Sequence, residues 1–121
     1  MSDESARPSL DELAALLAEF ARERDWDQFH SPKNLAMALT VEAAELMEIF
    51  QWLTEEQSRA PEADVAAAAS DEIADVLIYL VRIAGQLGID PVEAAKRKLA
   101  ANARKYPVDK ARGNARKYDK L

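Results

Sequence analysis

Two pairs of acidic residues have the spacing of a metal site built on helices. Glu42 and Glu45 are three residues apart, and so are Glu72 and Asp75. Residues three apart lie on one face of an α-helix, so two such helices packed together would bring four carboxylates to one point. Carboxylate oxygens are hard ligands that suit Mg²⁺ or Mn²⁺ better than zinc or copper. The spacing therefore predicts a divalent-cation site.

The apolar pattern around the acids strengthens this prediction. Glu42 occupies one position of a core-facing helical stripe whose other members are Leu35, Leu39, Leu46, Ile49 and Leu53. Crowded, half-buried carboxylates repel one another and take up protons unless a cation bridges them. A single Glu-x-x-Glu is more often a solvated helix edge. Two copies, each beside an apolar stripe, favour the metal site.

The remaining reactive residue types exclude several other chemistries. The absence of Cys excludes disulfides, thiolate metal sites and a Cys nucleophile. His30 is the only histidine, and it has no partner pattern for metal ligation or nucleophile activation. Trp26 and Phe29 lie in the same expected connector. They either stack on a base or plug the end of a helical bundle, and the spacing alone leaves both alternatives open.

The elements that must position these residues are helices. Ala, Leu, Glu, Lys and Arg are abundant and only three Gly occur, which is typical of an all-α protein. Capping signals at Ser9, Ser31 and Asp90, and a stop at Gly88, divide the chain into four expected helices. They cover residues 10–24, 32–53, about 61–65 to 86, and 91–105, with a polar connector expected over residues 54–64.

Length and charge bound the organisation of the protein. The chain of 121 residues suits one domain over residues 1–121, with a basic tail from about residue 107. Residues 96–121 hold ten Lys or Arg against two acids, whereas the rest holds six against twenty. The acidic body disfavours nucleic acid as a stable partner, and the basic end offers phosphate ligands. In that end, the pentapeptide Asn-Ala-Arg-Lys-Tyr occurs at 102–106 and 114–118, by coincidence or as two similar phosphate-facing turns.

The distribution of apolar residues also predicts where the protein is located and whether it assembles. The first residues are polar rather than signal-like and no apolar run approaches ~20 residues, which favours a cytoplasmic protein without membrane contact. Residues 76–81 are apolar all round the expected helix. Because one apolar face of such a helix would stay exposed to solvent in a small bundle, we expect a partner chain to cover it.

The acid pairs in context resemble the MazG-like superfamily of all-α nucleotide pyrophosphohydrolases. That pattern is Glu-x-x-Glu on one helix and Glu-x-x-Asp on the next, here Glu42-Ala-Ala-Glu45 and Glu72-Ile-Ala-Asp75. Within the superfamily the resemblance is greatest to the dCTP pyrophosphatases, through residues 20–30, 48–52, 75–81 and 104–107. It extends over about residues 10–120.

This resemblance implies a four-helix bundle that assembles as a homotetramer. It also implies Mg²⁺-dependent hydrolysis of a deoxynucleoside triphosphate, dCTP or a modified dCTP, to the monophosphate and pyrophosphate. The implied metal ligands are Glu42, Glu45, Glu72 and Asp75. The implied substrate contacts are Trp26, His30 and Trp52 for base and sugar, Tyr79 in the matching 75–81 stretch, and Asn102, Lys105 and Tyr106 for phosphates. The tail beyond Pro107 matches only loosely.

The chemistry of hydrolysis assigns one further residue role, and two other functions compete with this interpretation. A carboxylate not fully occupied by metal can accept the proton of the attacking water, and we assign this role to Glu45. A di-iron carboxylate bundle needs Glu-x-x-His on two helices, which a single His in a connector cannot supply. The second rival is a non-enzymatic helical interaction module whose acids are solvated. The preferred base stays open at this point.

Overall fold

The computed structural model describes residues 8–121, which form helices and no strand. The four longer helices are α1 (Leu10–Glu23), α2 (Pro32–Phe50), α4 (Ala63–Leu87) and α5 (Pro91–Lys105). Three short ones are α3 (Glu55–Arg59), α6 (Val108–Ala111) and the 3-10 helix η1 (Tyr118–Lys120). The predicted all-α class is therefore confirmed. The polar start of the sequence, residues 1–7, from which no signal peptide is expected, lies outside the described residues.

Local capping explains where α1, α2 and α5 begin and where α4 ends. The side chains of Ser9, Ser31 and Asp90 each accept a hydrogen bond from a backbone N–H two or three residues later, at 3.0–3.1 Å. These bonds satisfy N–H groups that have no partner inside the helix. Gly88 ends α4 with a φ of 67°, a conformation that glycine adopts without steric cost. All four predicted signals are confirmed.

The segment after α2 differs from the prediction. Helix α2 ends at Phe50 rather than near Leu53, and residues 54–64 contain the short helix α3 instead of a connector throughout. Thr54 is extended, and its side chain accepts from the Gln57 N–H while the Gln57 side chain accepts from the Thr54 N–H. This reciprocal capping box starts a new helix and prevents α2 from continuing. The Thr-x-x-Gln spacing is the signal that the sequence reasoning missed.

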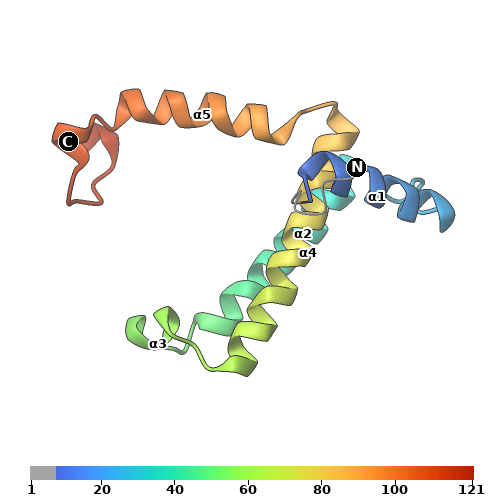
Figure 1. Ribbon diagram of the computed structural model, residues 1–121, viewed down its shortest axis with the longest axis horizontal. Coiled ribbons are helices and arrows are strands. Elements are labelled where there is room, and N and C mark those ends of the chain that lie inside the picture. Colours follow the sequence, from blue (N-terminus) through green and yellow to red (C-terminus); the bar gives the residue numbers. More distant parts are fainter. Residues whose placement is uncertain (1–7) are drawn as a thin grey trace, which may run out of the picture. The chain divides into compact units, whose positions relative to one another are not determined.

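The described residues fall into two compact units, one ending at Gly88 and the other covering Ile89–Leu121. In the first unit, α2 and α4 run side by side in opposite directions, and α1 contacts α4 (Figure 1). The side chains buried in the described part of the chain are few and mostly small: Ala21, Leu35, Ala69, Val81 and Ala84. The close approach of α2 and α4 is what brings their acidic residues together.

The predicted apolar stripe of α2 faces this contact. Leu35 is 1% exposed, and Leu39, Leu46 and Ile49 are half-buried, as is Glu42 within the same stripe. The stripe prediction is confirmed, with Leu53 half-buried beyond the helix end.

Large apolar side chains remain on the surface of the first unit. Within the apolar stretch 76–81 Val81 is buried, whereas Leu80 is 46% exposed. On α2, Met37 and Met47 are about 60% exposed. None of the described helices is both long and apolar enough to cross a bilayer.

The second unit folds its tail back on the end of α5. The rings of Tyr106 and Tyr118 meet edge to face at 6.1 Å, and Lys105 Nζ lies 4.9 Å from the centre of the Tyr118 ring. The two copies of the repeated pentapeptide therefore meet through their tyrosines. Their conformations differ, because the first copy ends α5 and the second is non-helical until η1. They are not two similar turns.

Candidate active site

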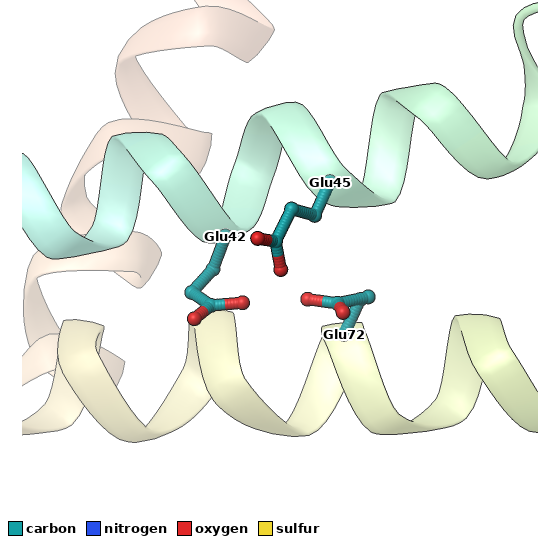
Figure 2. Close-up of side chains that lie close together, drawn as sticks. All are labelled: Glu42, Glu45 and Glu72. Atoms are coloured by element: carbon teal, nitrogen blue, oxygen red, sulfur yellow. The ribbon is translucent and has the colours of Figure 1, made fainter.

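Three of the four predicted acids form a cluster between α2 and α4. Glu42 and Glu45 extend from α2, and Glu72 extends toward them from α4 (Figure 2). One carboxylate oxygen from each of the three lies within 4.8 Å of the others. The three-residue spacing on one helix and the antiparallel packing of its neighbour together produce this convergence.

The electrostatics of the cluster are unfavourable without a cation. Glu42 Oε2 and Glu72 Oε2 are buried and have no hydrogen-bond partner within residues 8–121. The neighbouring Glu72 carboxyl raises the pKa of Glu42, because a protonated Glu42 can donate a hydrogen bond to it; burial and the charges of Glu72 and Asp75 act in the same direction. The pKa of Glu45 is raised as well, mainly by a hydrogen bond with the Glu42 carboxyl and by its charge.

A divalent cation fits this arrangement. Unpartnered buried carboxylate oxygens are costly, and a cation supplies the missing partner for both at once. Around one Mg²⁺, with metal–oxygen distances of about 2.1 Å, ligand oxygens are roughly 3 to 4 Å apart, so small side-chain adjustments suffice. The donor set is composed of carboxylate oxygens alone, which matches the preference of Mg²⁺ and Mn²⁺.

Asp75 lies one turn after Glu72 on α4 and links the cluster to a cavity. It is half-buried, and its charge contributes to the raised pKa of Glu42, although it is outside the group of three converging oxygens. It is also one of the residues that line a cavity of about 330 Å³ in the first unit. The full lining is Leu17, Phe20, Ala21, Trp26, His30, Asp75, Ile78, Tyr79 and Arg82. The volume lies within the range of small-molecule sites, about 300–1,000 Å³.

The structure separates the two tryptophans. Trp26 lines the cavity, meets the Phe20 ring edge to face at 5.7 Å and is 42% exposed. Trp52 is 88% exposed just after α2 and does not line this cavity. Phe29 is 58% exposed, so none of the three is a buried plug. Of the predicted base contacts, the structure brings Trp26, His30 and Tyr79 together.

His30 belongs to a polar network that sequence reasoning missed. Arg82 Nη2 lies 3.0 Å from Asp27 Oδ1 and 3.3 Å from His30 Nδ1. Burial lowers the pKa of His30, the charge of Arg82 lowers it further, and Asp27 opposes the shift. The available signal was a lone Arg between Val81 and Ile83 in an apolar stretch. Contacts over more than fifty residues are not readable from local spacing.

The predicted phosphate contacts lie in the second unit. Asn102 and Tyr106 are half-buried at the end of α5, and Lys105 is exposed beside them. Three groups that bind phosphate well, an amide, an ammonium and a phenol, are thus neighbours at one helix end.

Comparison with known proteins gives a consistent result. A model of the MazG-like family matches residues 37–121, which contain both acid pairs. The chain is 45% identical to dCTP pyrophosphatase 1 of Bos taurus over 120 residues, which is 97% of this chain and 70% of that protein. The human protein of the same name is 45% identical over 121 residues, with the same coverage.

A solved structure agrees with the sequence relatives. The crystal structure of a pyrophosphatase from Archaeoglobus fulgidus superposes with a TM-score of 0.77 at 40% sequence identity. The match covers 88% of this chain and 99% of that one. The helical arrangement is therefore shared with a protein named as a pyrophosphatase.

Proposed function

Because the chain belongs to the MazG-like family, we propose that it cleaves a deoxynucleoside triphosphate, preferably dCTP or a modified dCTP, with Mg²⁺ as cofactor. It is a nucleotide pyrophosphohydrolase of the dCTP pyrophosphatase type, and water splits its substrate into a nucleoside monophosphate and pyrophosphate. The observation that carries the proposal is the cluster of Glu42, Glu45 and Glu72, with its unpartnered buried oxygens, beside a cavity of about 330 Å³.

The metal is proposed to be held by Glu42, Glu45, Glu72 and Asp75. When bound, Mg²⁺ neutralises the phosphate charge and makes a water molecule more acidic; Mn²⁺ is an acceptable substitute. Asp75 is proposed as the fourth ligand, since this residue lines the cavity and its charge contributes to the raised pKa of Glu42.

Glu45 is the proposed general base. It is the exposed member of the cluster, so a water molecule can reach it without entering the contact between α2 and α4. Its pKa is raised by Glu42, and a base with a raised pKa holds the abstracted proton more firmly.

The cavity is the proposed site for base and sugar. Trp26 offers a ring face for stacking, and His30 and Tyr79 offer hydrogen bonds from the same lining. Trp52 remains a proposed base contact through the family resemblance alone. Asn102, Lys105 and Tyr106 are likewise proposed to contact the phosphates, and no role is proposed for the tail beyond Pro107.

Assembly and location complete the proposal. The exposed apolar side chains on α2 and α4 of the first unit, including Met37, Met47 and Leu80, favour a homotetramer that buries them. We further propose that residues 1–121 function as one MazG-like domain with a basic tail from about residue 107, in the cytoplasm.

Product analysis tests the proposed function. The wild-type protein is incubated with each of the four deoxynucleoside triphosphates and with 5-methyl-dCTP, with Mg²⁺ or with EDTA, and the products are identified by ³¹P NMR. The expected products are pyrophosphate and a monophosphate, formed fastest from the cytosine nucleotides and only with metal. Orthophosphate and a diphosphate as products, or equal turnover in EDTA, would contradict the proposal.

A further inference from the structure

Arg82 is a charged residue in the cavity wall that the proposed reaction does not yet use. Its side chain is only 11% exposed, and its Nε is buried without a hydrogen-bond partner among the described residues. Placing a guanidinium there costs desolvation free energy, which one exposed partner, Asp27, offsets only in part. Because Arg82 lines the cavity, a ligand there with a hydrogen-bond acceptor would give the guanidinium a further partner.

The direction of the hydrogen bonds in this network follows from the donors. Arginine can only donate, so His30 Nδ1, 3.3 Å from Arg82 Nη2, must be the acceptor. An accepting Nδ1 means a neutral ring whose hydrogen sits on Nε2. Arg82 thereby fixes His30 as an Nε2–H donor.

Three of the polar side chains that line the cavity are therefore donors only. Trp26, His30 and Arg82 each carry N–H groups, and with Nδ1 of His30 already accepting from Arg82 none of the three has a free acceptor. The other polar lining residues are Asp75, which belongs with the acid cluster, and Tyr79, whose hydroxyl both donates and accepts. A base that presents two adjacent acceptors matches such a wall. Cytosine does so with O2 and N3, whereas uracil and thymine carry a hydrogen on N3 that would face another donor.

We propose that Arg82 is a specificity-determining residue that, directly and through His30, selects cytosine over uracil and thymine by pairing with the O2 and N3 acceptors. The inference rests on the proposed function, because it assigns the base of the same substrate to the same cavity. It adds a residue and a chemical reason for the preference.

A purely structural role is the alternative. The ion pair between Arg82 and Asp27 ties α4 to the connector before α2, and its loss alone could loosen the cavity. Such loosening would lower turnover of every nucleotide by a similar factor. A specificity role instead changes the ratio between two nucleotides that differ only at the N3 edge and its neighbouring C4 group.

Two matched substrate pairs provide that comparison: dCTP with dUTP, and 5-methyl-dCTP with dTTP. The ratio of kcat/KM within each pair is measured for wild type, Arg82→Gln, Arg82→Lys and the control Arg22→Gln. Arg22 is an exposed residue of α1 that pairs with Glu19 and lies outside the cavity lining. Arg82→Lys keeps the positive charge near Asp27 but loses the Nε donor, so it serves where Arg82→Gln fails to fold.

Both ratios are expected to fall by roughly ten-fold or more in the Arg82 variants, because the loss of one charge-assisted hydrogen bond weakens binding by about that factor. Neither ratio should change for Arg22→Gln. Unchanged ratios in a folded Arg82 variant would overturn the proposal, whatever the loss of overall activity.

A second readout does not depend on hydrolysis. The chain has a single histidine, so the ¹⁵N signals of His30 are assignable without mutagenesis. Metal-free wild type is expected to carry its hydrogen on Nε2, and deoxycytidine is expected to shift these signals at lower concentration than deoxyuridine. An Nδ1–H ring or equal binding of the two nucleosides would overturn the proposal. If wild type hydrolyses no triphosphate but shows these signals, the proposed function fails while the base preference stands.

Discussion

Truncation of Trp26 distinguishes a role of this side chain in substrate binding from a role in stabilising the fold. The ring is 42% exposed and contacts Phe20 edge to face at 5.7 Å. A fully buried Trp→Ala change costs about 3–5 kcal/mol, so the partial burial of Trp26 scales this to about 2–3 kcal/mol, including the aromatic pair. We expect Trp26→Ala to fold with a lowered melting temperature.

The effect on the substrate is expected to be of similar size and confined to binding. Stacking on a base is worth about 1–3 kcal/mol, which corresponds to a roughly 5- to 150-fold rise in KM for dCTP. Because the base does not react, the stacking free energy is the same in the ground and transition states, and kcat should stay close to that of wild type. Inhibition by pyrophosphate, which has no base, should not change.

The assay is steady-state pyrophosphate release from dCTP beside thermal melts of the same preparations. Trp52→Ala is the matched variant, because its side chain is 88% exposed and its loss should alter stability of the chain by no more than about 0.5 kcal/mol. A rise in KM for Trp52→Ala would support its proposed base contact, and the cavity geometry predicts a smaller rise than for Trp26→Ala. A large loss of stability in Trp26→Ala with an unchanged KM would refute the stacking role.

Three further predictions follow from the acid cluster and the exposed surface. Glu42→Gln should abolish metal-dependent turnover yet raise the melting temperature of the metal-free protein, because it removes one anion from the cluster; full activity would contradict the ligand assignment. The pKa values of Glu42 and Glu45 are raised in the folded state, so the folded protein holds these protons more tightly than the unfolded chain. The two glutamates stabilise the fold fully below the ordinary pKa of 4.5, and this contribution is lost as pH rises through their raised pKa values. The melting temperature of the metal-free protein should therefore fall with rising pH. Saturating Mg²⁺ should make the melting temperature depend less on pH. Light scattering at micromolar concentration should give the mass of four chains of 13.4 kDa, and a monomer would contradict the burial of Met37, Met47 and Leu80 in an assembly.

The acid cluster could be predicted from the sequence because its geometry is local on each helix. A three-residue spacing fixes which face Glu42 and Glu45 share, and the apolar stripe through Leu35 fixes which side of α2 packs inward. The start of α2 and the end of α4 were predictable for the same reason, since Ser31 and Gly88 act on neighbouring backbone groups.

The cavity network could not be predicted in this way. Arg82 meets Asp27 and His30 across more than fifty residues, and only the packing of α4 against the connector brings them together. Whether Trp26 is a core plug or a cavity wall depends equally on tertiary packing, and the observed partial exposure supports the cavity wall. Helix α2 ends earlier than predicted, and the capping box of Thr54 and Gln57 starts α3 where a connector is expected.

Metal binding by the carboxylates tests the central claim most directly. Mn²⁺ is titrated into the protein with a non-hydrolysable dCTP analogue, and the free ion is followed by electron paramagnetic resonance in wild type, Glu72→Gln and the control Glu56→Gln. Glu56 is an exposed residue of α3 outside the cluster. Wild type and Glu56→Gln should bind Mn²⁺ with the same affinity, and Glu72→Gln should bind it at least roughly ten-fold more weakly, since one charged ligand is lost. Equal Mn²⁺ binding by all three proteins would contradict a metal site at Glu42, Glu45 and Glu72.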